Sequence, residues 1–558
     1  MNHRREKITS LTEAIRQVVD GSQVAVGGLS YFNAPMALVR ELIRQRKRDL
    51  TLITAAISSF QADLLIGAGC VRRLISPYVA FEELGLAPNF RRAVEKGEVE
   101  LVEIGEAFLA FALKAAASGS PFYALPRSLA AADTARISNH YRIATDPFTG
   151  QEVLCVPALR PDWAILHAQQ SDPFGNVRYL GSPFMDPLLA RASRHVIISC
   201  DELISNETIR SDPWATAIPA MMVDRVVPIH GAAHPTASEP LYGVDREHFK
   251  LYIGASKTTE GLADYLHQFV ISASDPEEYL AKVGGLKPTQ PPVAEPVNLD
   301  APPSMAETMA TVFARCIEDG YFVGVGTGCW EVAAGVKLAQ LTHAPNLSFS
   351  MGGTAALNPQ LDYLPLSVNS SEAIHSAEAV IELENLFDLE LNGTFDAMFA
   401  SGLQIDQFGN LNLACIGDPS APKLRGPGSV GLEFTPCVKR LVAFFRRHTR
   451  HAFVEKVDFI SGPGYLDGPS SRSRFGMDET SGPYLVVTNL AVMDFDPESK
   501  RMRLKSVHPG VSVQEVKENT AFQLIIPESV ETTPLPAQQE LKLLRTVIDR
   551  HGLLRTLI

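Results

Sequence analysis

The residues best placed for chemistry are a carboxylate and several glycine-rich turns. Glu106 follows the β-rich run EVELVEI (98–104) and one glycine, and it opens an apolar helical segment. A side chain at a strand-to-helix junction lies at the carboxyl end of its strand, where open α/β sheets place their sites. Glu106 is therefore the first candidate for a reacting group. Its alternative interpretation is an ordinary acid favoured by the dipole at a helix N-terminus.

The glycine-rich turns predict close approach of backbone to a ligand. Gly27 and Gly28 end a short β-rich run, and the turn GVGTG (324–328) ends another. Neither spacing matches the fingerprint of a dinucleotide-binding turn. Asn33 can direct its amide into a cleft, although asparagine also serves simply to form turns.

The composition narrows the classes of protein to which this chain can belong. The chain has 558 residues and a net charge of −13, with no long basic tract, so no nucleic-acid partner is expected. Its seven cysteines form no CxxC pair, which argues against a disulfide scaffold or a zinc cluster and favours a reducing cytoplasm. No histidine spacing predicts a metal site. We find no apolar run of about 18 residues and expect no membrane span.

A proline-rich segment divides the chain. It has the sequence GGLKPTQPPVAEPVNLDAPP, which is incompatible with a helix or a central strand. We predict a linker over 284–304 between a first domain, 1–283, and a second domain, 305–558.

Both halves alternate strand and helix signals. In the first half, strands are predicted within 20–30, 49–56, 68–79, 98–104, 162–168, 194–203 and 224–231. The segment 35–46 has apolar residues at helical spacing, with Pro35 suited to a first turn. This alternation predicts open α/β sheets with parallel strands.

The second half repeats segments of the first in the same order. The paired segments are 20–29 and 319–328, 162–180 and 395–413, 195–200 and 440–445, and 225–233 and 456–464. One pair shares Asp-x-Phe-Gly-Asn, at Asp172–Asn176 and Asp406–Asn410. Four matches in order predict a duplication or a fusion of two related subunits, with the active site between them.

The repeated segments resemble the class I coenzyme A transferases, most closely the glutaconate CoA-transferase type with its A-like and B-like subunits fused. The A-like signals are GGLSYFNAPMALVREL (27–42), YVAFEELGLAPNFRRAVEKGEVELVE (78–103), FALKAAASGSPFYALPR (111–127) and SDPFGNV (171–177). The B-like signals are GVGTG (324–328), GLQIDQFGNLN (402–412), IGDPSAPKLRGPGSVG (416–431) and FVEKVDFISGPGYL (453–466). The resemblance implies doubled open sheets, acyl-CoA and small carboxylate substrates, coenzyme A as the thioester rather than a bound cofactor, and a homo-oligomer.

The chain departs from this family at its nucleophile. The family attacks the acyl-CoA with a glutamate of the B subunit, which becomes a glutamyl-CoA thioester. In the matching stretch NLSFSMGGTA, from Asn346, the position falls on Met351 or Ser350, and neither side chain can form that intermediate.

A related family of CoA-transferase-like hydrolases opens carbon rings of steroid-derived acyl-CoAs. It resembles this chain in lacking the B-subunit glutamate and in carrying an acid/base glutamate on the A-like half. Glu106 matches that position. Arg127 matches a basic residue that can hold a substrate carboxylate, although it can equally form a solvent-exposed ion pair.

The resemblance also assigns roles to glycine-rich loops. GPGSVG (426–431) resembles the family loop whose backbone N–H groups form an oxyanion hole, with Gly428 and Ser429 as the donors, and a plain turn as the alternative. Gly27, Gly28, Gly326 and Gly328 are candidates to face the pantetheine or phosphates of coenzyme A.

Three functions are compatible with these observations. The first is transfer of CoA between an acyl-CoA and a carboxylic acid, which the family favours. The second is hydrolysis of a carbon–carbon bond in a cyclic keto-acyl-CoA, with Glu106 activating water, which the missing second-half glutamate favours. The third is CoA binding without catalysis.

Overall fold

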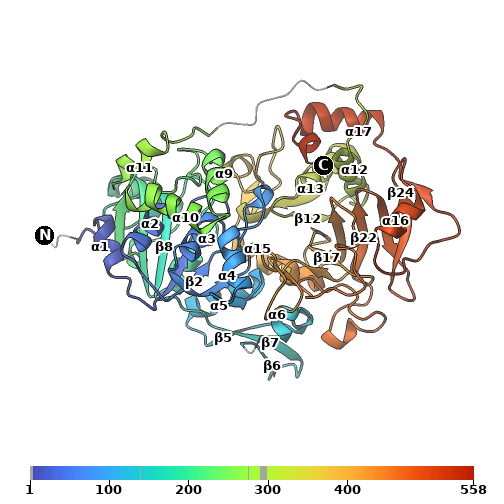
Figure 1. The fold of residues 1–558 in the computed structure, drawn as a ribbon, viewed down its shortest axis with the longest axis horizontal. Helices are drawn as coiled ribbons and strands as arrows, with labels where there is room; N and C mark the ends of the chain where they lie inside the picture. Colours follow the sequence, from blue (N-terminus) through green and yellow to red (C-terminus); the bar gives the residue numbers. More distant parts are fainter. Residues whose placement is uncertain (1–3, 139, 274, 290–297, 558) are drawn as a thin grey trace.

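The computed structural model describes residues 4–138, 140–273, 275–289 and 298–557. The chain forms two α/β lobes that lie side by side, the first in blue to green and the second in yellow to red in Figure 1. Each lobe is built on one large sheet with helices packed against it. The predicted fold class is confirmed.

The sheet of the first lobe has the order β11-β10-β8-β1-β2-β3-β4, and every neighbouring pair in this order is parallel. These strands span β1 Gln23–Val26, β2 Leu50–Thr54, β3 Val71–Ser76, β4 Glu100–Glu103, β8 Trp163–Ser171, β10 His195–Leu203 and β11 Arg225–Pro228. Each overlaps a predicted strand. All five residues of β2 are buried, as expected for a parallel strand covered by helices on both faces.

The sheet of the second lobe repeats this arrangement. Its order is β15-β14-β13-β12-β16-β21-β22-β23-β24-β25, and the parallel core β22-β21-β16-β12-β13 follows the order of β11-β10-β8-β1-β2. The strands span β12 Phe322–Val325, β13 Ser348–Met351, β14 Ala356–Leu357, β15 Ala379–Val380, β16 Ala397–Ala400, β21 Arg440–Phe445, β22 Gly482–Thr488, β23 Ala491–Phe495, β24 Met502–Val507 and β25 Glu531–Thr532.

One predicted match between the halves is wrong. Residues 456–464, paired in sequence with 225–233, form no strand of this sheet, and β22 takes the place beside β21 that β11 takes beside β10. The segment 456–464 has strand-like residues but lies in the long loop before β22. The strand that pairs with β21 therefore comes later in the chain than the sequence match indicates.

The repeated Asp-x-Phe-Gly-Asn motif forms the same turn twice. Asp172 Oδ1 accepts a hydrogen bond from Asn176 N at 2.9 Å, and Asp406 Oδ1 accepts one from Asn410 N at 3.1 Å. In both turns the asparagine side chain also donates to the aspartate. The motif therefore marks a structural repeat, since the same side chains satisfy the same backbone groups.

Helices cover both sheets. In the first lobe they are α1 Leu11–Arg16, α2 Met36–Arg44, α3 Phe60–Gly67, α4 Pro88–Glu95, α5 Glu106–Ser118, α6 Asp133–Arg136, α7 Asp186–Ala192, α8 Asn206–Ser211, α9 Arg246–Ala255, α10 Thr259–Leu266 and α11 Pro276–Lys282. In the second they are α12 Met305–Arg315, α13 Trp330–Thr342, α14 Ser371–His375, α15 Leu383–Leu391, α16 Val513–Glu518 and α17 Gln538–Leu543. A small antiparallel sheet of β5 Phe122–Pro126, β7 Glu152–Pro157 and β6 Arg142–Thr145 projects from the first lobe.

Helix α5 carries the candidate carboxylate, Glu106, as its first residue. Alanine, leucine and phenylalanine dominate the helix, and all but three of its residues are buried. It ends at Gly119, whose left-handed backbone (φ +75°) suits a helix C-cap. Helix α5 is therefore part of the core, and its packing fixes the position of Glu106.

The predicted linker is anchored at each end. Gly243 N donates to Lys287 O at 2.8 Å in the first lobe, and Arg545 of the second lobe donates to Asn298 O and Ala301 O. Residues 290–297 of this segment lie outside the described residues, and the domain boundaries stay a prediction. Within the described part of the chain, no helix has the length and hydropathy needed to cross a membrane.

Candidate active site

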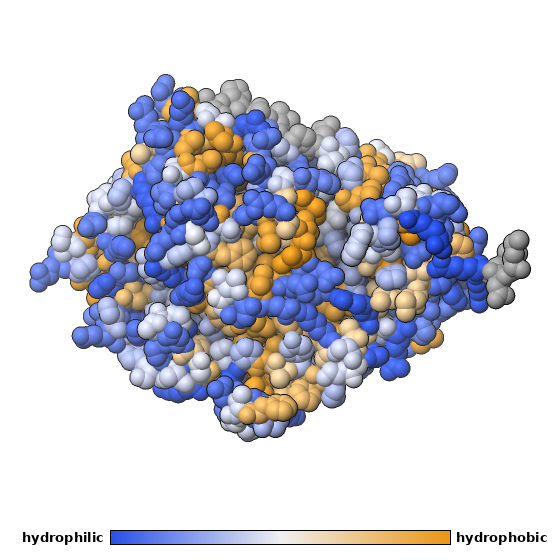
Figure 2. Space-filling view, turned by 180° about the vertical axis from the view of Figure 1, so that it is seen from behind, coloured by the Kyte–Doolittle hydropathy of each residue, from blue (hydrophilic) through white to orange (hydrophobic). Residues whose placement is uncertain are grey.

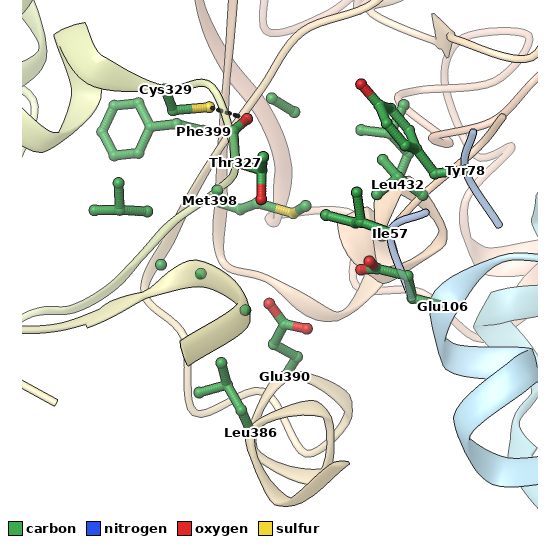
Figure 3. A pocket seen from close by; sticks show the side chains of 18 of the residues that line it. Ile57, Tyr78, Glu106, Thr327, Cys329, Leu386, Glu390, Met398, Phe399 and Leu432 are labelled. Atoms are coloured by element: carbon green, nitrogen blue, oxygen red, sulfur yellow. Dashed lines mark hydrogen bonds between the residues drawn. The ribbon is translucent and has the colours of Figure 1, made fainter. Parts of the chain in front are cut away.

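A cavity of about 280 Å³ lies between the two lobes. Its wall is mostly apolar, and both halves of the chain contribute to it (Figure 3). The lining side chains and glycines include Ile57, Tyr78 and Glu106 from the first half, and Gly326, Thr327, Cys329, Ser350, Glu390, Val430 and Gly431 from the second. On the face seen in Figure 2, hydrophobic residues gather in a central band between hydrophilic flanks.

Backbone hydrogen bonds join the lobes beside the cavity. Val79 N donates to Pro427 O at 2.8 Å, and Val430 N donates to Pro77 O at 3.0 Å. Glu106 N donates to Val430 O, also at 3.0 Å. The second-half loop 427–431 is therefore held against the start of α5, which fixes Glu106 relative to the opposite lobe.

Glu106 is the first residue of α5 and lines the cavity. Its side chain is 9% exposed, and no hydrogen bond or ion pair to its carboxylate is found within the described part of the chain. Desolvation in this apolar wall raises its pKa to about 8. A carboxyl with such a pKa changes protonation close to neutral pH, as a general base or acid must.

Two further glutamates of the second lobe lie near Glu106. Glu390, near the end of α15, lines the same cavity, and burial together with the Glu106 charge raises its pKa well above the usual range. Glu433 lies behind the start of α5, where its Oε1 accepts from Ala107 N at 2.7 Å, and burial raises its pKa as well. Sequence reasoning missed both residues, and Glu390 in particular sits in an ordinary amphipathic helix with no motif around it.

The two residues predicted to match the family nucleophile, Met351 and Ser350, lie at the end of β13. Both residues are 1% exposed; Ser350 lines the cavity, whereas Met351 packs into the core of the second lobe. Successive strand residues point to opposite faces, so of these two only Ser350 lies on the cavity side of the strand. Neither residue supplies a carboxylate at this place.

The loop predicted to form the oxyanion hole borders the cavity, but the residues that line the cavity are not the two predicted donors. Pro427, Val430 and Gly431 line the cavity, whereas Gly428 and Ser429 do not. Gly428 has φ +129°, and a Cβ there would lie 2.2 Å from Pro77 O. Ser429 is fully buried, with its hydroxyl 3.1 Å from that of Ser461. The donor roles of Gly428 and Ser429 stay a prediction.

The predicted substrate-binding side chains lie away from the cavity wall. Arg127 directly follows β5 and forms an ion pair at 3.2 Å with Glu152 of β7, on the small projecting sheet. Asn33 is buried in the first lobe, where its Nδ2 donates to Ser182 O at 3.0 Å and its Oδ1 accepts from Gln169 Nε2 at 2.9 Å.

The glycines predicted to face coenzyme A divide into two groups. Gly326 lines the cavity, and Gly328 lies just beyond it, where its carbonyl accepts from Arg446. Gly27 and Gly28 pack on the buried Asp186 carboxylate, which accepts from Gly28 N at 3.0 Å. A Cβ on Gly27 would lie 2.3 Å from that carboxylate, so packing alone requires this glycine.

The fold and the inter-lobe site define a two-lobed α/β enzyme. A family model described as "Coenzyme A transferase" matches residues 8–228 and again 306–519, most of the chain and both of its halves. The chain belongs to the coenzyme A transferase family. The double match confirms the internal repeat predicted from the sequence.

Three curated relatives each align with about half of this chain. The A chain of glutaconate CoA-transferase from Acidaminococcus fermentans is 34% identical over 50% of this chain and 93% of its own length. The B chain of the same enzyme is 32% identical over 44% of this chain and 91% of its own length. The cholesterol ring-cleaving hydrolase IpdA subunit of Mycobacterium tuberculosis is 29% identical over 48% of this chain and 93% of its own length.

Two other matches bear on length and fold. An uncharacterized protein of Archaeoglobus fulgidus is 38% identical over 50% of this chain, and the alignment covers 63% of that protein. A crystal structure of an acyl-CoA transferase from Escherichia coli O157:H7, as a thioester complex with CoA, aligns with 96% of this chain at a TM-score of 0.69 and 15% identity. This last likeness shows the two-lobed fold alone.

Proposed function

We propose that this protein is an acyl-CoA-processing hydrolase that adds water across a carbon–carbon bond of a cyclic β-keto-acyl-CoA. The observation that carries the proposal is the position of Glu106: a carboxylate from the first half that has no partner among the described residues and faces an apolar inter-lobe cavity. The stretch predicted to match the family nucleophile offers Met351 or Ser350 in place of a glutamate. One of the chain's relatives is named as a ring-cleaving hydrolase.

The chemistry assigned to Glu106 is general-base activation of water. Its ionised carboxylate takes a proton from water as the oxygen attacks the ring ketone, and a tetrahedral alkoxide forms. The loop 427–431 of the opposite lobe contacts the start of α5, and we assign it the stabilisation of that alkoxide through N–H groups.

The apolar wall favours an apolar acyl group. Ile57, Tyr78, Leu386, Met398 and Phe399 surround the space in front of Glu106 (Figure 3). A carbocyclic ring buries its surface well against such side chains. Coenzyme A contacts at Gly326 and Gly328 and assembly into a homo-oligomer remain part of the proposal.

The second candidate is CoA transfer between an acyl-CoA and a carboxylic acid. It is favoured by the presence of two cavity carboxylates, Glu106 and Glu390, either of which could carry a glutamyl-CoA thioester. The two reactions differ in the species that attacks: water in hydrolysis, and a protein carboxylate in transfer.

One experiment separates these reactions. The protein is incubated in ¹⁸O-labelled water with oxocyclohexane-carbonyl-CoA, whose ketone neighbours the carbon that bears the thioester, and in parallel with acetyl-CoA plus free carboxylic acids. Hydrolysis predicts a ring-opened product carrying ¹⁸O in its new carboxyl group. Transfer predicts new acyl-CoA thioesters and a glutamate that borohydride reduces to an alcohol detectable by mass spectrometry. CoA binding with neither product would leave a non-catalytic role.

A further inference from the structure

Glu390 faces Glu106 across the cavity. The two carboxyl groups come from different lobes and point toward the same space in Figure 3. Glu106 is the first residue of α5, and Glu390 lies in the last turn of α15. The two glutamates are more than 280 residues apart in the chain. This approach exists only because the lobes pack together.

The helix that carries Glu390 is fastened to the helix that carries Glu106. Lys114 of α5 forms an ion pair with Asp388 at 2.7 Å and donates to Glu384 O at 2.9 Å. Arg191 of α7 adds a further ion pair to Glu384. These contacts fix the separation of the two cavity carboxyls, as a pair that acts on one substrate requires.

Neither cavity carboxyl serves an evident structural purpose. Within the described residues, no hydrogen bond or ion pair to either carboxylate is found, and the nearby Lys114 is engaged by Asp388. A buried carboxyl without a partner, such as Glu106, destabilises a fold. Glu390 is half-buried, and the convergence of the two groups on one cavity points instead to a use in chemistry.

Burial and mutual repulsion oppose ionisation of both cavity carboxyls. Among the described residues, the titratable groups near Glu390 include Glu106, Glu433 and Cys437, whose pKa values burial raises, and Asp388 on the same helix forms an ion pair with Lys114. Like charges in such a space cannot all ionise, so removing a proton from one carboxyl hinders its removal from the next. The pair therefore keeps at least one proton over a wider pH range than two isolated carboxyls would, so that one group can act as a base while the other still holds a proton.

We propose that Glu390 is the general acid of the same reaction, giving its proton to the carbon that leaves when the carbon–carbon bond breaks. This rests on the function proposed above. Glu106 takes a proton from water, and the hydroxide oxygen bonds to the ring ketone. The alkoxide then collapses, the bond to the thioester-bearing carbon breaks, and its electron pair forms a carbanion stabilised by the thioester carbonyl.

Proton transfer from Glu390 to this carbon completes the reaction. The products are a carboxylic acid and a C–H bond, so one water has been added and nothing is oxidised or reduced. Glu106 holds the proton from water, and Glu390 is ionised. Transfer of that proton from Glu106 to Glu390 restores both groups, and their placement on one cavity makes this reset short.

The test compares Glu390→Gln with Glu382→Gln, a matched change at the exposed start of the same helix. With oxocyclohexane-carbonyl-CoA we expect Glu390→Gln to lower kcat by about 10–10³-fold with little change in KM. Glu382→Gln should behave as the wild type. Glu390→Asp, which keeps an acid one methylene shorter, should recover part of the loss.

The pH profile adds a readout that a structural role would not move. The wild-type rate should rise with pH as Glu106 ionises and fall at higher pH as Glu390 does, with apparent pKa values that belong to the pair. In Glu390→Gln the alkaline fall should disappear. Thermal melting and gel filtration establish that each variant is folded.

The outcomes distinguish the proposed role of Glu390 as the acid from the proposed hydrolase function on which it rests. If the wild type incorporates ¹⁸O but Glu390→Gln keeps full kcat and the alkaline fall, Glu390 is not the acid, and the hydrolase function stands. If the wild type opens no ring and borohydride traps a glutamyl-CoA, both proposals are overturned. Trapping at Glu390 itself would make that residue a nucleophile instead.

Discussion

At the scale of single residues, the burial of Glu106 determines both its reactivity and the stability that the folded protein loses when this carboxyl is ionised. The carboxyl opens a helix, faces an apolar cavity and has no partner within the described part of the chain, so the charged form lacks the solvation it would have in water. The same desolvation that brings its pKa near neutrality also weakens the folded state when the group is ionised.

Replacing Glu106 tests its role as the base. We expect Glu106→Gln to lower kcat for ring opening by about 10²–10⁴-fold, because the amide cannot accept a proton from water. Steady-state kinetics with the cyclic β-keto thioester measure the effect. Glu100→Gln, at an exposed position on neighbouring β4, is the control and should retain activity. An active Glu106→Gln variant would remove this residue from the mechanism.

The same substitution should stabilise the protein at alkaline pH. Glu106 ionises near pH 4.5 in the unfolded chain and near pH 8 in the folded one. Between these values the unfolded chain has released a proton that the folded protein keeps, so stability falls as pH rises through this window and then levels.

Glu106→Gln removes that loss. The melting temperature of the variant should equal that of the wild type near pH 4.5 and exceed it progressively up to pH 8. The gain is at most about 5 kcal/mol at the alkaline end. Melting curves at a series of pH values measure the difference, and a difference that is constant with pH would contradict the assigned burial.

At the scale of elements, the start of α5 is set by a glycine. A Cβ on Gly105 would lie 2.0 Å from Glu433 Oε1, the atom that accepts from Ala107 N. No rotation of a flexible end relieves this clash without breaking that hydrogen bond. The helix start, and with it Glu106, therefore depends on the absence of a side chain at residue 105.

We expect Gly105→Ala to lower the free energy of unfolding by roughly 1–3 kcal/mol, because it overpacks a buried site. It should also reduce kcat, since Glu106 moves with the helix. Gly254→Ala is the matched control: it lies in a helix with open space around its Cβ position and should be neutral or slightly stabilising. Chemical denaturation and kinetics of both variants measure these effects.

At the scale of the whole molecule, contacts between the lobes hold the site together. Besides the backbone bonds at Pro77, Val79 and Glu106, Arg425 of the second half forms an ion pair with Glu103 at 2.7 Å, and both side chains are largely buried. None of these contacts uses the connecting segment. The curated relatives, moreover, include separate A and B subunits.

A chain interrupted within 290–297 and co-expressed as two polypeptides should therefore still assemble. Both pieces should co-elute on gel filtration and retain wild-type kcat, because each end of the connector is anchored in its own lobe. Gly428→Ala should weaken this complex, since its Cβ would meet Pro77 O. Failure of the two pieces to associate would mean that the covalent connection is needed.

The sequence by itself determined the alternation of strands and helices, the internal repeat, the family and the position of Glu106 at the end of a strand. These features are local, because hydrophobic periodicity and turn residues act over a few neighbouring positions. The match of residues 456–464 with 225–233 was wrong, because a short apolar segment does not determine which strand lies beside β21 in the sheet.

Only the tertiary structure decided which groups share the cavity. It placed Ser350 on the cavity wall and Met351 in the core, left Arg127 beside the projecting sheet, and brought Glu390 opposite Glu106. Such juxtapositions depend on how the two lobes pack, and that packing is set by many weak contacts between distant segments. No local pattern in the chain encodes them.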